Sequence, residues 1–338
     1  MKVGLFSSVK NEGPFILEWV AYHSMIGFGP ILVYSNDSDD GTDAVLDALD
    51  RNGVLHHVLQ TLDPEDVPQF RAAERGYGHP AFADADWLMW MDTDEFLFLT
   101  PPASSVRDLI GQISDDADGI AVNWLNFGDS GHAEWSPEPV TQRFFKRAPD
   151  HNNRHNHFKT LFRKSEAIRG FGLHRPHVNG DFRDQGRRFV NGAGLPLHDD
   201  MYRHGKRMRH ALGATPPELV SHQMAAICHY PVKTMDSFLL KRMRGSGVAP
   251  RDSEDRAKRF QDRYLRVYNH NTVEDTRMMQ HGEALRSEIA RLQSLPGVAE
   301  AYESAILRYK AKLEKLKETS KADATAVAAS DNADGQDA

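Results

Sequence analysis

Short apolar runs alternate with amphipathic stretches over the first third of the chain. The apolar runs have the length of buried strands, and the stretches between them repeat apolar residues at helical spacing. This alternation of strand and helix predicts a doubly wound, Rossmann-like, mostly parallel sheet of the α/β class. The predicted strands are Val3–Val9, Ile31–Tyr34, Val54–Val58 and Trp87–Met91, and the predicted helices cover Pro14–Ile26, the residues around Val45–Leu49, and Gln69–Ala83.

The pattern becomes less regular after Gly119, where one more strand is predicted to run through Trp124. The part from Arg143 to His210 is rich in His and Arg and is expected to form loops that build a site. Apolar stripes on either side of Pro296 predict C-terminal helices, since proline interrupts a helix. We therefore expect three parts: a domain over 1–245, with one half at 1–125 and a second half at 126–245, a helical extension over 246–318, and a disordered tail over 319–338.

Composition and charge narrow the class of protein. The chain has 338 residues and a formal net charge of −7, which does not favour a nucleic-acid partner. Its single cysteine, Cys228, excludes an internal disulfide and CxxC metal knuckles. Neither a signal peptide nor an apolar run of transmembrane length is evident. The predicted location is the cytoplasm, or the inner face of the membrane for a peripheral protein.

The sharpest candidate for chemistry is the acidic motif Asp92-Thr93-Asp94-Glu95, which follows the doubly apolar run Trp87–Met91. Ligands of open α/β sheets bind beyond the carboxyl ends of the strands, where this motif is expected to lie. Alternate carboxylates on an extended turn can converge on a hard divalent cation, which keeps positions open for phosphate oxygens. On its own a DxD motif is also compatible with a solvated loop. Its place after a buried strand favours a metal site.

A second polar turn follows the strand Ile31–Tyr34. Asp37 can accept hydrogen bonds from a ribose or a base there, and Gly41 permits the turn. The alternative is an ordinary turn in which Asp and Thr cap the next helix. The chain contains neither the P-loop motif nor the G-x-G-x-x-G of dinucleotide-binding domains, and it lacks HExxH and GxSxG as well.

Several short motifs are spaced along the chain up to about Met278: Val9–Glu12, Glu18–His23, Gly27–Phe28, Asn36–Asp37, Asp40–Thr42, Pro68–Gln69, Ala85–Trp87, Asp92–Phe96, Phe127–Gly128, Lys159–Arg163, His174–Pro176, Asn191–Gly192, His229–Tyr230, Lys241 and Arg244–Gly245. Their order and spacing resemble the family-2-type glycosyltransferases of GT-A fold, in the bacterial branch similar to family 92. The resemblance implies transfer of a sugar from a nucleotide-diphosphate donor, with UDP favoured, to a glycan or lipid-linked acceptor, as in polysaccharide biosynthesis.

The resemblance also implies roles for individual residues. Asp37 contacts the nucleoside, and Lys10, Asn11 and Glu12 line the same pocket. Asp92 meets the ribose and the metal, which is Mn²⁺ or Mg²⁺, and Asp94 is the stronger ligand candidate. His229 is the candidate for a further metal ligand, although a histidine in an apolar stretch is also commonly a core residue. The remaining donor-site candidates are Lys241 and Arg244, which share a helix face and can clamp a diphosphate, and Trp124, which can stack on a sugar ring.

An inverting transfer also needs a carboxylate that deprotonates the acceptor hydroxyl. The resemblance assigns the half over 1–125 to the donor and the half over 126–245 to the acceptor. Asp181 and Asp199, in the acceptor half, are the candidates for this base. The Glu274-Asp275 pair resembles the acidic pair of family-2 enzymes but comes late in the chain. Retention needs no such base and stays open. Two other classes remain as alternatives: a different metal-dependent enzyme of nucleotide sugars, such as a diphosphohydrolase or nucleotidyltransferase, and a non-catalytic sugar-nucleotide or glycan binder. The C-terminal helices are candidates for self-association.

Overall fold

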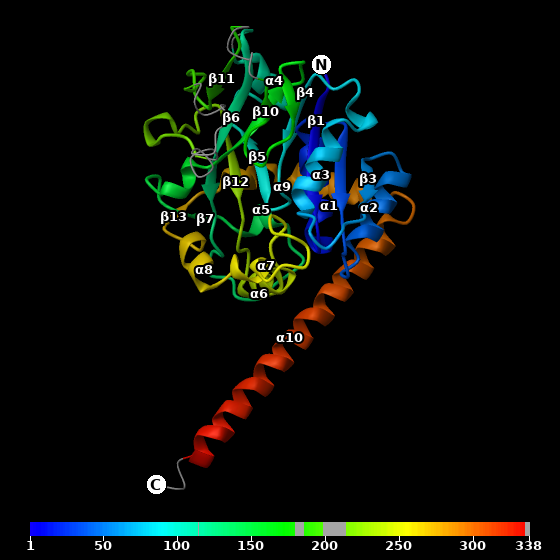
Figure 1. Cartoon of the computed structure of the whole chain (residues 1–338), viewed down its shortest axis with the longest axis vertical. Coiled ribbons are helices and arrows are strands. Elements are labelled where there is room, and N and C mark those ends of the chain that lie inside the picture. Colours follow the sequence, from blue (N-terminus) through cyan, green and yellow to red (C-terminus); the bar gives the residue numbers. More distant parts are fainter. Residues whose placement is uncertain (114, 180–185, 199–213, 335–338) are drawn as a thin grey trace.

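The computed structural model consists of a central sheet with helices on both sides, and the long helix α10 extends away from this body (Figure 1). The structure describes residues 1–113, 115–179, 186–198 and 214–334, with side chains described as far as Thr319. The strands are β1 (Val3–Val9), β2 (Ile31–Ser35), β3 (His56–Leu59), β4 (Trp87–Trp90), β5 (Glu95–Leu99), β6 (Ala117–Asn126), β7 (Lys146–Arg147), β8 (Phe158–Arg163), β9 (Ile168–Gly170), β10 (His177–Val178), β11 (Arg188–Asn191), β12 (Ala225–His229) and β13 (Val273–Glu274).

The helices of the first third lie between the strands, as predicted. Helix α1 begins with a proline in its first turn, where a missing N–H costs nothing. Helix α3 ends at Tyr77, earlier than predicted, because Gly78 and Pro80 follow. The helices are α1 (Gly13–Met25), α2 (Thr42–Arg51), α3 (Pro68–Tyr77), α4 (Val106–Gly111), α5 (Val140–Arg143), α6 (Met235–Arg244), α7 (Asp255–Lys258), α8 (Asp262–Tyr268), α9 (Gly282–Gln293) and α10 (Val298–Asp334).

Nine of the described strands form one sheet, in the order β3-β2-β1-β4-β8-β6-β12-β5, with β11 paired to β6. The pairs β2–β3, β1–β2, β1–β4, β6–β12 and β6–β11 are parallel, whereas β8 and β5 run antiparallel to their neighbours. The predicted α/β class with a mostly parallel sheet is therefore confirmed. The antiparallel strands β5 and β8 were not predicted.

The core occupies both faces of this sheet. One apolar cluster joins the sheet to α1, α2, α9 and α10, and a second cluster joins the opposite face to α3 and the segment around Phe171. Strand β4 lies in the middle and is buried along its whole length, as its apolar sequence predicts. Its carboxyl end leads directly into the acidic motif Asp92–Glu95.

Helix α10 is longer than the sequence predicts. Its backbone is helical as far as Asp334, so the stretch over 319–334 differs from the predicted disordered tail. Alanine-rich sequence has high helix propensity even without bulky apolar residues, which explains the difference. No helix among the described residues is long and apolar enough to cross a membrane. The division into three domains stays a prediction.

The burial of β4 leads to a stability prediction. Leu88 has an exposed fraction of 0%, whereas Leu307 on α10 has one of 66%. We expect Leu88→Ala to lower the free energy of unfolding by about 3 kcal/mol, because it removes apolar contacts and leaves a cavity. Leu307→Ala is the matched control and should change it by less than about 0.5 kcal/mol. Urea denaturation measures both values, and equal effects would contradict the described packing.

Candidate functional site

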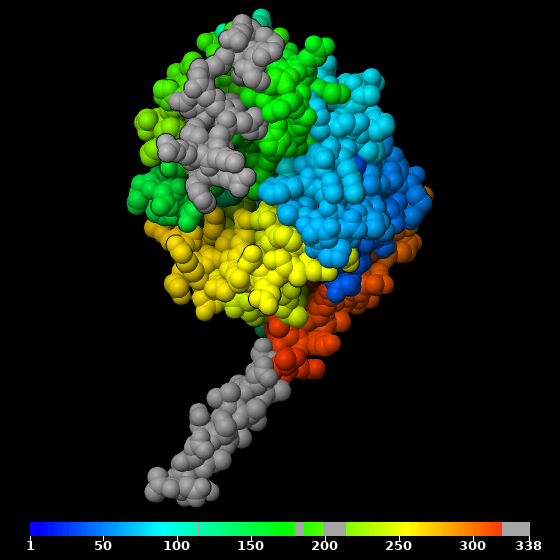
Figure 2. All heavy atoms as spheres, in the orientation of Figure 1, coloured from blue at the N-terminus to red at the C-terminus, as the bar shows by residue number. Residues whose placement is uncertain are grey.

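A narrow pocket of about 110 Å³ opens at the carboxyl ends of β1, β2 and β4. Because these strands are parallel neighbours, the residues that follow them meet at one edge of the sheet. The segment after α6 lies across this edge. The backbone N–H of Gln69 donates to the carbonyl oxygen of Gly247 at 3.1 Å, and the backbone N–H of Arg251 donates to the carbonyl oxygen of Asp66 at 2.8 Å. Figure 2 shows this segment, in yellow, packed against the blue N-terminal half.

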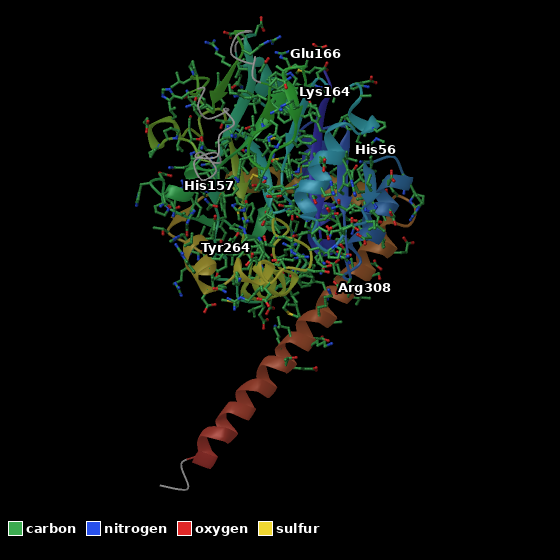
Figure 3. All side chains as sticks on the ribbon, in the orientation of Figure 1. His56, His157, Lys164, Glu166, Tyr264 and Arg308 are labelled. Atoms are coloured by element: carbon green, nitrogen blue, oxygen red, sulfur yellow. The ribbon has the colours of Figure 1, made fainter. Side chains whose placement is uncertain are left out.

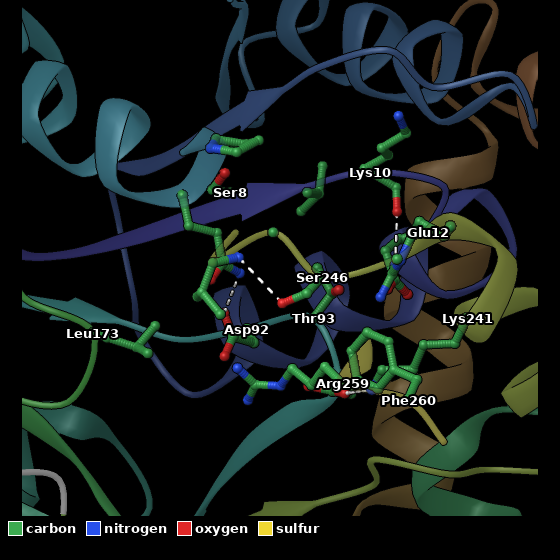
Figure 4. A pocket seen from close by; sticks show the side chains of 18 of the residues that line it. Ser8, Lys10, Glu12, Asp92, Thr93, Leu173, Lys241, Ser246, Arg259 and Phe260 are labelled. Carbon is green, nitrogen blue, oxygen red and sulfur yellow. Dashed lines mark hydrogen bonds and ion pairs between the residues drawn. The ribbon is translucent and has the colours of Figure 1, made fainter. Parts of the chain in front are cut away.

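Most of the donor-site and metal candidates from the sequence line this pocket. Figure 4 shows Lys10 and Glu12 near Lys241, with Asp92 and Thr93 on the other side of the pocket. The predicted residues that line it are Lys10, Glu12, Asp92, Asp94, Trp124, His229, Lys241 and Arg244.

Asp94 is one of the acidic residues of the pocket wall. It is buried, and its carboxylate accepts a hydrogen bond from Lys241 Nζ at 2.7 Å. Burial by itself would raise the pKa of Asp94, but the nearby positive charges, Lys241 foremost, outweigh it and hold that pKa well below its usual range. Asp94 is therefore a carboxylate at every physiological pH.

His229 faces Asp94 from the end of β12. Its Nε2 lies 3.8 Å from Asp94 Oδ1, too far for a hydrogen bond. Its Nδ1 is 2.8 Å from Asn126 Oδ1, so Nδ1 carries the proton and Nε2 keeps its lone pair toward Asp94. Burial lowers the pKa of His229 to about 3 despite the attraction of Asp94, and the imidazole is neutral. A neutral imidazole oriented by a second partner is the usual state of a metal ligand.

Asp92 lies near the same pocket but has other partners. Its Oδ2 accepts from Lys159 Nζ at 3.1 Å and its Oδ1 from Gln69 Nε2 at 3.3 Å. Lys159 Nζ is also 3.4 Å from Glu95 Oε2, and both Lys159 and Glu95 are fully buried. Burial, aided by the charges of Asp92 and Asp94, raises the pKa of Glu95 to about 8 against the opposing pull of Lys159. Lys159 thus fixes Asp92 while Asp94 faces the pocket.

The described residues contain no group of three or more His, Cys, Asp or Glu side chains placed to hold a metal ion. They do contain the pair Asp94 and His229, whose free oxygen and free nitrogen face each other across 3.8 Å beside the pocket. Mg²⁺ and similar cations are commonly held by one or two protein ligands together with substrate phosphates and water. The donor set therefore fits a divalent cation that is shared with a phosphorylated ligand.

Glu12 and Arg244 form another part of the wall. Arg244 Nη1 is hydrogen-bonded to a carboxylate oxygen of Glu12 and donates to the Lys10 carbonyl oxygen at 2.7 Å. Both side chains are largely buried, and α6 carries Arg244 one turn from Lys241. The predicted shared face of Lys241 and Arg244 is thus directed at the pocket.

Asn11 and Asp37 do not line this pocket; they line a neighbouring one. Asp37 accepts from Arg251 at 3.2 Å through both carboxylate oxygens, and its pKa is lowered: the hydrogen bond from Asn36 and the nearby charges of Lys10 and Arg251 outweigh the effect of burial. The Asn11 side chain accepts from a backbone N–H of the turn after β2 at 2.9 Å. Asn36, next to Asp37, reaches the first pocket instead.

Trp124 lies at the pocket, but much of its ring is already covered. It stacks on His157 with ring centroids 5.0 Å apart, and the His229 ring centroid is 4.2 Å away. Its indole Nε1 is buried without a hydrogen-bond partner among the described residues. Trp124 therefore orients His229 and offers a single N–H, and stacking on a sugar stays a prediction.

The candidates for the catalytic base are not placed by this structure, because Asp181 and Asp199 lie outside the described residues. The Asp275 carboxylate accepts from Arg147 at 2.6 Å and from Arg277 at 2.7 Å, and it does not line the pocket. Asp275 thus has a structural role, so the Glu274-Asp275 pair supplies no base to this site.

Several pocket residues were not predicted as site residues. They come from the first part of the predicted helical extension. This part folds over the sheet edge and contributes cations and aromatic rings to the pocket. Figure 3 shows Tyr264 on the same side of the molecule as His157, although they are far apart in sequence. The density of Arg and Tyr over 256–268 was the available signal. The missed residues are Ser246, Gly247, Arg256, Arg259, Phe260, Tyr264 and Tyr268.

Comparison with known proteins finds relatives for part of the chain. No known family profile matches it. A family 92 glycosyltransferase of Ricinus communis is 31% identical over 141 residues, which cover 39% of this chain and 24% of the relative. A family 92 glycosyltransferase of Oryza sativa is 29% identical over 138 residues, covering 39% of this chain and 22% of the relative. The chain thus spans about a quarter of the length of these relatives.

Solved structures give only distant likenesses. Residues 1–349 of Staphylococcus aureus TarS in complex with UDP-GlcNAc have a TM-score of 0.34 and 12% identity, and the match covers 94% of this chain and 92% of that TarS fragment. Glucosyl-3-phosphoglycerate synthase of Mycobacterium tuberculosis, in complex with Mn²⁺, UDP and glucosyl-3-phosphoglycerate, has a TM-score of 0.25 and 15% identity over 36% of this chain and 44% of that one. Scores this low support no conclusion about this chain. The two relatives that the sequence comparison identified are both family 92 glycosyltransferases.

Proposed function

We propose that this protein is a glycosyltransferase of GT-A type, which moves a sugar from a nucleotide-diphosphate donor, UDP favoured, to a hydroxyl group of a glycan or lipid-linked acceptor. The observation that carries the proposal is the meeting of Asp94 and His229 beside Lys241 at the carboxyl edge of the sheet. A carboxylate, a neutral imidazole and an ammonium there suit a cation and a diphosphate. The family 92 relatives support the same activity.

Asp94 and His229 would hold Mn²⁺ or Mg²⁺, which would neutralise charge on the diphosphate as it leaves the sugar. Asn126 Oδ1 accepts a hydrogen bond from the Nδ1–H of His229, so the lone pair of Nε2 stays available. Lys159 fixes the Asp92 carboxylate, which would be the second acidic group toward the ribose and the cation.

The cations of the pocket complement the phosphates. Lys241 and Arg244 come from α6, and Arg256 and Arg259 come from the segment that folds over the edge. Fixed donors of this kind stabilise charge that develops on a leaving group. Asn36, with Lys10 and Asp37 behind it, is placed for the nucleoside. For an inverting reaction, Asp181 or Asp199 would take the proton of the acceptor hydroxyl.

A thermal-shift panel of nucleotide sugars tests this proposal. A ligand that binds only the native state raises the melting temperature, so we expect one donor class to raise it in Mn²⁺ and to lose most of the effect in EDTA. The same donor should then yield a glycoside in an acceptor screen. Release of free sugar phosphate without any glycoside, or no stabilisation by any nucleotide sugar, would contradict the proposal.

A further inference from the structure

A second pocket adjoins the donor pocket and is larger, with a volume of about 510 Å³. It lies between the start of α1, helix α6 and the body-facing part of α10. Lys10, Glu12, Lys241 and Arg244 line both pockets and form the wall between them. The proposed glycosyl transfer assigns no role to this second pocket.

The acidic residues of the second pocket already have partners. Glu12 is paired with Arg244, and Asp37 accepts from Arg251. Asp39 is paired with Lys312, and the Asp40 carboxylate accepts from the Gly13 N–H at 2.9 Å. These acids therefore need no cation from the pocket.

Two lysine ammonium groups in the same pocket are paired more loosely, or have no described carboxylate partner. Lys233 has an exposed fraction of only 5%, yet its Nζ makes no hydrogen bond to any described residue. Its nearest carboxylate oxygen, Glu12 Oε2, is 4.0 Å away, and the Phe15 ring centroid is 4.3 Å away. Lys315 enters the pocket from α10, and no described carboxylate lies within ion-pair distance of it. Lys233 shares the single charge of Glu12 with Arg244, so a buried positive charge is left without a hydrogen-bond acceptor of its own. Such a charge favours an anionic ligand, and the exposed Lys315 adds a second ammonium group.

The rest of the lining is apolar. Val232, Leu240, Leu316 and the Tyr309 ring contribute to it, and Met243 has an exposed fraction of 70%. An inorganic anion would leave this surface unused. A ligand that carries both an anionic group and an apolar portion uses the whole pocket.

We propose that this pocket is a second ligand site, which binds an organic phosphate. The phosphate lies at Lys233 and Lys315, and the apolar portion packs on Leu240 and Leu316. Two ammonium groups match the charge of a phosphate monoester. The site does not depend on glycosyl transfer, because the residues that would hold the ligand, Lys233, Lys315, Leu240 and Leu316, line the second pocket and not the donor pocket.

Calorimetric titration of the full chain with hexyl phosphate tests the site, with inorganic phosphate and hexanol as the two partial probes. We expect hexyl phosphate to bind more tightly than either partial probe. Lys233→Gln and Lys315→Gln should each weaken its binding about tenfold or more, since each removes a charge-assisted hydrogen bond. Lys315 is exposed, so its variant tests the site even where Lys233→Gln alters the fold.

Two controls locate the binding. Lys310→Gln makes the same change of charge on an exposed residue of α10 that does not line the pocket, and it should leave affinity unchanged. Arg259→Gln changes a residue of the donor pocket alone and should also leave it unchanged. Loss of binding in Arg259→Gln with retention in Lys315→Gln would assign the phosphate to the donor pocket and overturn the proposal. Equal affinity for inorganic and hexyl phosphate would overturn the organic nature of the ligand.

Discussion

Asp94→Asn should reduce glycosyl transfer by about a thousandfold or more, because the amide keeps the shape of the carboxylate and removes the charge that faces His229. Metal-dependent stabilisation by the donor should disappear with it. Initial rates and thermal shifts with and without Mn²⁺ measure the two effects. Transfer at the wild-type rate would show that Asp94 holds no cation.

Asp94→Asn should also lower the free energy of unfolding, because Asp94 is the ion-pair partner of the largely buried Lys241. Removing one member of a buried pair leaves the other charge uncompensated, which costs about 3 kcal/mol. The double variant Asp94→Asn with Lys241→Met removes both charges and should regain much of this stability. It should stay inactive, and recovery of activity together with stability would contradict the assigned role.

Lys159→Met should have the largest effect on stability. It leaves the fully buried Glu95 and the partly exposed Asp92 without their shared cation, and we expect a loss of about 3 kcal/mol in the free energy of unfolding. Urea denaturation measures it. The exposed Lys310→Met is the matched control and should change stability by less than about 0.5 kcal/mol.

The effect of Lys159→Met should also depend on pH. The pKa of Glu95 is about 8 in the folded protein and 4.5 in the unfolded reference. The contribution of Glu95 to the free energy of unfolding is therefore fully present below pH 4.5 and declines as the pH rises to about 8. Without Lys159 that pKa rises further, and the decline continues to higher pH. The variant should therefore lose more stability at pH 9 than at pH 6. Adding Glu95→Gln should abolish this difference between pH 9 and pH 6. If the stability lost in Lys159→Met alone did not depend on pH, the described burial of Glu95 would be contradicted.

The periodicity of the sequence was enough to predict the sheet edge that builds the site. The runs ending at Val9, Tyr34 and Met91 are local patterns, and parallel pairing brings their ends together wherever helices connect them. Asp92 and Asp94 follow directly from this reasoning, whereas Lys10 was predicted only from the resemblance to known glycosyltransferases. His229 came from the resemblance to known glycosyltransferases, and nothing in its apolar surroundings distinguishes a ligand from a core histidine.

Contacts between distant segments could not be predicted in the same way. Lys159 reaches Asp92 because β8 is inserted antiparallel between β4 and β6, and no local pattern encodes that order. Arg259 and Tyr264 belong to a segment whose composition resembles a solvated surface, yet it folds over the donor edge. Asp37 was expected in the donor pocket, but Arg251 holds it at the adjoining one.

The central claim is that Asp94 and His229 together bind a divalent cation with the donor diphosphate. Anomalous diffraction at the manganese edge, from crystals grown with Mn²⁺ and UDP, tests it most directly. The account predicts one manganese peak in contact with Asp94, His229 and oxygens of the diphosphate. A UDP molecule bound in the pocket with no manganese between Asp94 and His229 would contradict it.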